Sequence, residues 1–103
     1  MSDLDIVVKA INLILSPRRI ILFGSRAKSG DKNDSDIDLA VIQEKKPKFG
    51  QRAKVFRKLL DMGYDWKAEP DIHIFSENDF EKRLKNNSFF VREIMKGKTI
   101  YAV

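Results

Sequence analysis

The 103-residue sequence contains no cysteine, three prolines, and only one histidine and one tryptophan. Without cysteine it can form neither a disulfide framework nor a zinc site with thiolate ligands. No apolar run approaches the roughly 20 residues that a membrane-spanning helix needs. The opening Met1-Ser2-Asp3 also lacks the basic segment with which a signal peptide begins. We therefore expect a cytoplasmic protein that does not enter a membrane.

Charge of both signs is abundant, by contrast. Charged residues make up 34% of the chain and hydrophobic residues 43%, and the formal net charge is +5. This mixture argues against disorder, and the apolar fraction suffices for one core. We expect a single domain over residues 1–103. The positive charge suits an anionic partner such as a nucleotide, a nucleic acid or an acidic protein surface, and it equally suits a basic solvated surface.

Apolar periodicity and turn residues predict a small α/β (α+β) domain. Helices are expected where apolar residues recur every three to four positions, and strands where short apolar runs end at turn residues. The resulting order gives one small mixed β-sheet covered by helices on one face. The expected elements are a helix from Ser2 to about Ser16, strands at 19–23 and 36–42, a loop over 29–34, a helix with Phe49, Ala53, Phe56, Leu59 and Leu60 on its core side that ends near Gly63, a strand at 71–75, a short helix from Glu77 capped by Ser76, a helix over 87–96 and an extended piece at 100–101.

The apolar run at 19–23 is followed at once by Gly24-Ser25. Glycine lets the backbone turn tightly and approach a ligand without a Cβ in the way. Backbone N–H groups and the Ser25 hydroxyl, at the start of a short helix, can then hold phosphate oxygens. Arg26 and Lys28 could contact the outer phosphates. An ordinary strand-to-helix turn accounts for the same dipeptide, so Gly-Ser alone does not define a site.

Two aspartates, Asp36 and Asp38, lie in the next expected strand. Aspartate is disfavoured in strands. Because side chains alternate along a strand, both carboxylates point to one face, with their Cα atoms about 6–7 Å apart. Such anions repel each other unless a cation lies between them, and magnesium is usually held by one or two carboxylates plus phosphates. The pair predicts a magnesium site, although a solvated strand start can also carry acidic residues.

A third aspartate, Asp71, opens the strand expected at 71–75. If this strand pairs beside the one that carries Asp36 and Asp38, the three side chains form a carboxylate triad. A triad of this kind can hold two metal ions that stabilise the attacking and leaving oxygens of an in-line displacement. Asp71 could also accept the proton of the attacking hydroxyl. Taken alone, an aspartate after Pro70 is an ordinary strand entry.

The stretch from Leu22 to Gly30, followed five residues later by the stretch from Asp36 to Val41, resembles the signature of the polymerase-beta-like nucleotidyltransferase superfamily. More narrowly, the chain is similar to the minimal nucleotidyltransferases, small proteins typically paired with HEPN-domain partners. One departure is Ser29, where the family usually has glycine. The resemblance implies that Gly24 and Ser25 hold the triphosphate and that Asp36, Asp38 and Asp71 form a catalytic site with two Mg²⁺ ions. Arg26 is added to the expected nucleotide site because it follows the turn directly.

This resemblance implies transfer of a nucleotidyl group, AMP from ATP, to a hydroxyl acceptor. In the family the acceptor would be a tyrosine of a HEPN toxin, which would make the chain the antitoxin of a type VII toxin–antitoxin system. Nucleic acid is not expected as a direct substrate, because the chain shows no further domain to grip it. Two alternatives remain open: a non-catalytic subunit that masks its partner, and an enzyme that modifies a small molecule such as an aminoglycoside.

Several other residues have two interpretations each. His73 shares a strand face with Asp71 and could approach the site, or it could be a partly exposed structural histidine. Tyr64 and Trp66 could stack on a base or on a partner. The pair Phe89-Phe90 is expected in the core, although one ring could meet a partner. The acceptor, the base preference and the oligomeric state are left open by the sequence.

Overall fold

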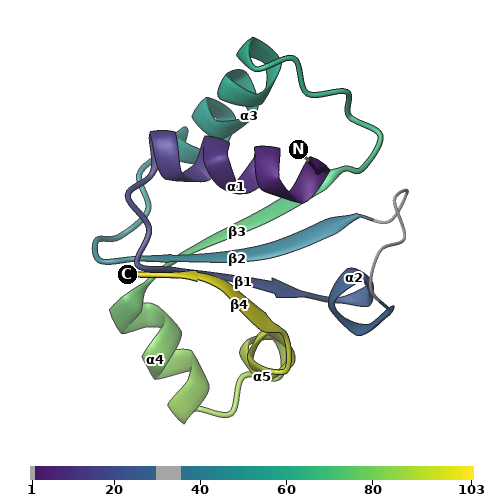
Figure 1. The fold of residues 1–103 in the computed structure, drawn as a ribbon. Helices are drawn as coiled ribbons and strands as arrows, with labels where there is room; N and C mark the ends of the chain where they lie inside the picture. The colour runs from purple at the N-terminus through teal and green to yellow at the C-terminus, as the bar shows by residue number, and fades with distance from the viewer. Residues whose placement is uncertain (1, 30–35) are drawn as a thin grey trace.

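The computed structural model of the chain describes residues 2–29 and 36–103. Helices and strands follow one another in the order that the sequence predicts (Figure 1). Of the loop expected over 29–34, residues 30–34 lie outside the described residues, and Ser29 ends a helix. The elements are α1 (Asp3–Ile14), β1 (Arg19–Phe23), α2 (Ser25–Ser29), β2 (Ile37–Gln43), α3 (Gln51–Asp61), β3 (Pro70–Ser76), α4 (Glu77–Lys85), α5 (Phe89–Met95) and β4 (Lys98–Ala102).

The first helix begins where the sequence predicts because Ser2 and Asp5 form a capping box. The Ser2 hydroxyl accepts a hydrogen bond from the Asp5 N–H at 3.1 Å, and the Asp5 carboxylate accepts one from the Ser2 N–H at 3.3 Å. These bonds satisfy N–H groups that the first turn leaves without helical partners. The helix ends at Ile14, ahead of Pro17, which disfavours helix in the residue before it.

The four strands form one mixed sheet in the order β3-β2-β1-β4. β1 pairs antiparallel with both β2 and β4, and β2 pairs parallel with β3. β3 and β4 are therefore the edges, and an edge strand can accommodate Pro70, which has no N–H to donate. The strands expected at 19–23 and 71–75 are confirmed. β2 begins at Ile37, which leaves Asp36 just ahead of the strand.

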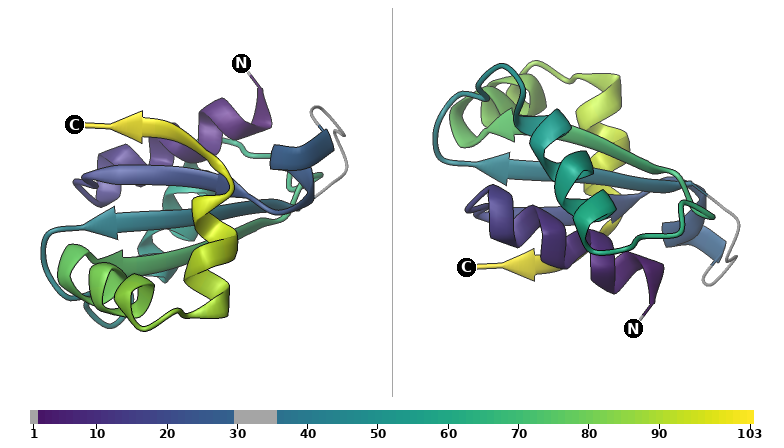
Figure 2. Two further views of the ribbon diagram at one scale, coloured as in Figure 1. Left: turned by 90° about the horizontal axis from the view of Figure 1, so that it is seen from below. Right: turned by 90° about the horizontal axis from the view of Figure 1, so that it is seen from above.

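Helices cover both faces of the sheet, so the expected coverage of one face is wrong. Figures 1 and 2 show α1 and α3 on one side of the strands and α4 and α5 on the other. The reason lies in β1 and β2, which are apolar at nearly every position and buried almost throughout, as strands covered on both faces are. One hydrophobic cluster includes Ile20, Leu22, Leu39 and Val41 with residues of α1 and α3, and the second includes Ile21, Phe23, Ala40 and Ile42 with residues of α4 and α5.

The helix α3 buries only part of the side that was expected: Leu59 is fully buried and Phe56 packs against the first hydrophobic cluster, whereas Ala53 is exposed. Phe49 precedes the helix and is fully exposed, and Leu60 is 61% exposed, whereas Val55 and Leu59 are fully buried. The helix begins at Gln51, so Phe49 cannot belong to its apolar stripe. Val55 and Leu59 are four residues apart and therefore share one side of the helix.

The C-terminal third contains two short capped helices and the fourth strand. The Ser76 hydroxyl accepts a hydrogen bond from the Asp79 N–H at 3.0 Å, which confirms the expected cap of α4. The hydroxyl of Ser88 accepts one from the Val91 N–H at 3.4 Å at the start of α5. The extended piece expected at 100–101 is the strand β4, which completes the sheet beside β1.

The expectation that Phe89 and Phe90 both belong to the core is wrong. Phe89 is 79% exposed and Phe90 39% exposed, whereas the same helix buries Val91 and Ile94. A helix of seven residues offers only one narrow side to the sheet, and Val91 and Ile94, three positions apart, occupy it. Two aromatic rings are thus left near the surface of α5.

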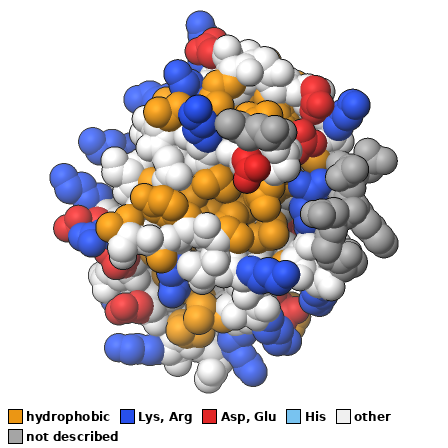
Figure 3. Space-filling model, viewed as in Figure 1, with side chains coloured by type: hydrophobic (Ala, Val, Ile, Leu, Met, Phe, Trp, Pro, Cys, Tyr) orange, Lys and Arg blue, Asp and Glu red, His pale blue; other side chains and the backbone are white. Residues whose placement is uncertain are grey.

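The surface combines apolar and basic areas. Figure 3 shows hydrophobic side chains gathered across the middle of one face, with Lys and Arg side chains around them. Partly buried residues of α1 and β4, including Leu4, Val8, Ile100 and Tyr101, pack against the first hydrophobic cluster. Among the described residues, none of the helices has the length and apolar character required to cross a membrane.

The neighbouring leucines of α3 allow a direct test of which face is buried. Leu59→Ala should lower the free energy of unfolding by about 2–5 kcal/mol, because it removes a fully buried side chain and leaves a cavity. Leu60→Ala should lower it by less than about 0.5 kcal/mol, because that side chain is largely in water. Urea denaturation of both variants measures the difference. Equal losses would contradict the observed orientation of α3.

Candidate active site

Three segments that are distant in sequence meet at one end of the sheet. Phe23, the last residue of β1, lies opposite Asp38 of β2 in the antiparallel register. Asp38 in turn lies opposite Asp71 of β3 in the parallel register. Asp36 precedes β2 by one residue, and Gly24 follows β1 directly. The strand pairing that the sequence could state only as a condition is therefore present, and Asp38 and Asp71 are neighbours.

Gly24 forms the turn after β1 in a backbone conformation that other residues rarely adopt. Its φ is +76°, in the left-handed region that favours glycine. A Cβ at this position would collide with the Oδ2 atom of the Asp38 carboxylate. The turn therefore needs glycine for two independent reasons. Ser25, which is exposed, follows directly as the first residue of α2, and Figure 1 shows α2 at the same end of the sheet.

The surroundings of Asp38 affect its ionisation. Burial raises the pKa of Asp38, and the negative charges of Asp71 and Asp36 raise it further. The charge of His73 acts in the opposite direction. The candidate site thus holds like charges that repel one another in a half-buried place, an arrangement typical of functional sites.

His73 approaches the candidate site and is also a partly exposed structural residue, so both interpretations that the sequence left open are correct. Its Nε2 atom lies 3.1 Å from Oδ2 of Asp71, so the imidazole is hydrogen-bonded to a site carboxylate. Its ring centroid lies 5.9 Å from that of Phe23 and 5.0 Å from that of Phe90. The side chain is 31% exposed. His73 is therefore a packed side chain that also orients Asp71, and Phe90 contributes to its support.

Tyr64 and Trp66 lie apart from these carboxylates and pack within the chain. Tyr64 is buried and its hydroxyl donates to the Ala68 carbonyl. Burial raises the pKa of Tyr64 to about 12. Trp66 packs edge-on against Tyr64 and against Phe56 of α3. Both rings therefore have structural roles between α3 and β3. The positive charge of Arg26 acts against this rise in the pKa of Tyr64, so the two side chains are within electrostatic range of each other.

The carboxylate oxygens of the site are the ligand type that magnesium prefers. Their mutual repulsion, seen in the raised pKa of Asp38, is the electrostatic condition that a cation would relieve. Within residues 2–29 and 36–103, however, the structure contains no group of three or more Asp, Glu or His side chains placed to hold a metal ion. The residues present therefore fit an ion held by one or two carboxylates together with substrate phosphates, which is the usual magnesium arrangement.

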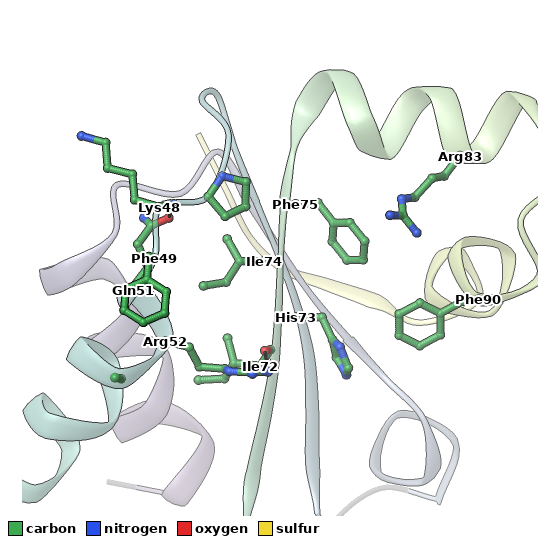
Figure 4. A pocket seen from close by; sticks show the side chains of 13 residues that line it. Lys48, Phe49, Gln51, Arg52, Ile72, His73, Ile74, Phe75, Arg83 and Phe90 are labelled. Atoms are coloured by element: carbon green, nitrogen blue, oxygen red, sulfur yellow. Dashed lines mark hydrogen bonds between the residues drawn. The ribbon is translucent and has the colours of Figure 1, made fainter.

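A pocket next to the site was not predicted from the sequence. It has a volume of about 590 Å³ and runs along β3 beside His73. Figure 4 shows Phe49 and Arg52 on one side of the strand and Arg83 and Phe90 on the other. These residues come from distant segments, and the sequence, from which Phe49 was expected on the core side of a helix, contained no signal for the pocket.

Residues 9–102 match the family described as polymerase beta, nucleotidyltransferase. The chain belongs to this family, which confirms the resemblance found in the sequence. No curated protein matches the sequence closely enough to count as a relative.

Solved structures of toxin–antitoxin complexes share the fold. A chain crystallised with AMP-PNP is 19% identical with a TM-score of 0.65, and the match covers 100% of this chain and 75% of that one. A mutant MntA–HpeT complex gives 17% identity, a TM-score of 0.63 and the same coverage. A complex of the tri-AMPylated Shewanella oneidensis HEPN toxin with the MNT antitoxin gives 20% identity, a TM-score of 0.55, and coverage of 98% and 73%. At these identities the likeness establishes the fold.

Alanine substitutions at two glycines with positive φ distinguish the cost of backbone strain from the cost of a collision with Asp38. Gly24→Ala and Gly50→Ala should each lose about 1–2 kcal/mol of stability, because both residues have positive φ. Gly24→Ala should lose more, because its Cβ also displaces the Asp38 carboxylate, whereas a Cβ at Gly50 meets nothing within 4 Å. Urea denaturation measures both losses. If they are equal, Gly24 does not contact Asp38 as described.

The raised pKa of Asp38 predicts how stability depends on pH. An aspartate whose folded pKa exceeds its unfolded value destabilises the folded state when ionised, and this penalty disappears below the unfolded value, at about pH 4. Asp38→Asn should therefore raise the free energy of unfolding at neutral pH and leave it unchanged in acid. Denaturation at both pH values measures this. Glu81→Gln, an exposed carboxylate in the middle of α4, is the control and should change little at either pH.

Proposed function

We propose that the chain transfers AMP from ATP to a hydroxyl group, that of a tyrosine on a HEPN-domain partner protein. The observation that carries the proposal is the position of Asp38, opposite Phe23 on one side and Asp71 on the other. This register brings the turn at Gly24 and the carboxylates to one point. A phosphate-binding turn and metal-binding carboxylates must be adjacent if both are to act on one triphosphate.

The residues would have distinct roles. The backbone at Gly24 and the Ser25 hydroxyl would hold the phosphates, and Arg26 would approach them through a change of its side-chain rotamer. Asp36, Asp38 and Asp71 would bind two magnesium ions, each held by one or two of the carboxylates together with phosphate oxygens. When bound, the ions supply positive charge that stabilises the attacking and leaving oxygens.

In the proposed reaction the acceptor oxygen forms a bond to the α-phosphorus of ATP. The bond between this phosphorus and the oxygen that bridges it to the β-phosphorus breaks, and pyrophosphate leaves. Asp71 accepts the proton of the hydroxyl, since it lies at the sheet edge and is half exposed. His73 holds this carboxylate in place through its hydrogen bond to Oδ2.

Related structures support the choice of nucleotide and partner. One chain of the same fold was crystallised with AMP-PNP, an analogue of ATP, and another belongs to a complex with an AMPylated HEPN toxin. Membership of the nucleotidyltransferase family is consistent with this chemistry. The partner of the present chain would be the corresponding toxin, and the chain its antitoxin.

Radiolabel transfer tests this function. The chain is incubated with Mg²⁺, ATP and a HEPN-domain protein. Label at the α-phosphate should enter the partner and label at the γ-phosphate should not. Asp38→Asn and Asp71→Asn should each reduce the rate at least ~100-fold, because several kcal/mol of charge stabilisation is lost. Asp61→Asn, an exposed carboxylate on α3, should retain the wild-type rate.

Three results would contradict the proposal. If wild type and Asp38→Asn neutralise the partner equally well without label transfer, the chain is a masking subunit. If label appears only on a small molecule such as an aminoglycoside, the acceptor is wrong. If the γ-label is transferred, the reaction is phosphorylation.

A further inference from the structure

The outer edge of β3 carries backbone groups that point away from the sheet. The Ile37 N–H donates to the Glu69 carbonyl at 2.9 Å, so the backbone of residue 69 faces β2. Because backbone groups alternate in direction along a strand, those of Ile72 and Ile74 face outward. The Arg52 side chain confirms this direction, since its Nη1 donates to the Ile72 carbonyl at 3.3 Å.

This edge lies inside the pocket of about 590 Å³. Figure 4 shows side chains of β3 alternating to its two sides, with Ile72 and Ile74 toward α3 and His73 and Phe75 toward α4 and α5. The edge is open at Ile74, whereas Ile72 is 1% exposed and its carbonyl is covered by Arg52, which an added strand would displace. A strand edge with side-chain pockets on both sides is the arrangement that receives an extended peptide as an added strand. Backbone hydrogen bonds then supply affinity, and the flanking pockets select alternate side chains.

The walls of this groove are basic. Lys48, Arg52 and Arg83 line it, and none of its described lining residues is acidic. Arg83 is partly neutralised by Asp79, whose Oδ2 lies 2.9 Å from its Nε. The remaining charge favours an acidic occupant and disfavours a second copy of this chain, which would bring a like-charged groove and a net charge of +5.

The groove leads to the carboxylate that is proposed as the base. His73 lines the groove and its Nε2 is 3.1 Å from Oδ2 of Asp71. Asp71 precedes Ile72 on the same strand. A segment paired along the outer edge of β3 would therefore continue past the end of the groove toward Asp71, where a hydroxyl must lie to lose its proton.

We propose that the groove along β3 binds an extended acidic segment of the partner protein, as an added strand that presents the acceptor hydroxyl to Asp71. This inference rests on the proposed function for the identity of the acceptor. Binding of the acidic segment itself depends only on the groove.

Selection from a displayed library of random decapeptides, with the whole chain as bait, tests the groove without nucleotide. Enriched peptides should carry net negative charge. Synthesised with fluorescein, they should bind Arg52→Glu roughly tenfold or more weakly than wild type, as expected for loss of a charged hydrogen-bond donor and reversal of its charge. Arg57→Glu makes the same charge change on α3 outside the groove and should bind as wild type does.

A second pair of variants tests strand addition. Ile74→Pro removes an outward N–H from an edge strand, where proline is tolerated, and should weaken binding about tenfold or more. Ile74→Val keeps the N–H and should bind as wild type does. Circular dichroism checks that each variant is folded, and if Ile74→Pro does not fold, Arg52→Glu decides.

The proposal is overturned if no peptide is enriched, if the enriched peptides are neutral or basic, or if folded Ile74→Pro binds them as wild type does. It is also overturned if a single-stranded DNA dodecamer binds in an Arg52-dependent manner and displaces the peptides, since the groove would then bind nucleic acid. Peptide binding without any AMP transfer would refute only the proposed function. Transfer with an unchanged acceptor KM in Arg52→Glu would refute only the groove.

Discussion

Electrostatic repulsion among aspartates at one end of a small sheet is the unfavourable interaction that the rest of the structure must offset. The parallel pairing of β2 and β3 holds Asp38 and Asp71 side by side. Burial raises the pKa of Asp38, and the negative charges of Asp71 and Asp36 raise it further. Such an arrangement opposes folding and must be offset by hydrophobic burial elsewhere. β1 and β2 supply it, because they are apolar on both faces and lie between two helical layers.

Local patterns in the sequence predicted the elements well. β1 was predicted from an apolar run that ends at Gly24, and α1 from the Ser2–Asp5 box, because these signals act within a few residues. The buried face of α3 was only partly predicted. Leu59 was correctly placed on the core side, but Phe56 and Leu60 make as good an apolar stripe as Val55 and Leu59. Only the tertiary position of the helix decides between two such stripes. Coverage of both sheet faces was missed for the same reason.

The candidate site was predictable in its residue types and only partly in its geometry. Alternation along β2 and the turn at Gly24 pointed to Asp38, whereas the neighbour relation with Asp71 required the strand order, which one sequence does not specify. The setting of His73 was beyond prediction, because the rings that contact it, Phe23 and Phe90, come from β1 and α5. Long-range contacts of this kind leave no periodic signal.

The division of the core into two clusters has a consequence for how the chain tolerates sequence change. The cluster beneath α1 and α3 contacts the sheet on the side away from the Asp38 carboxylate, whereas Phe23 belongs to the other cluster and touches His73. Substitutions in the cluster beneath α1 and α3 should therefore alter mainly the thermal stability of the chain. Substitutions beneath α4 and α5 change the setting of His73 as well, so they should alter the site in addition to stability.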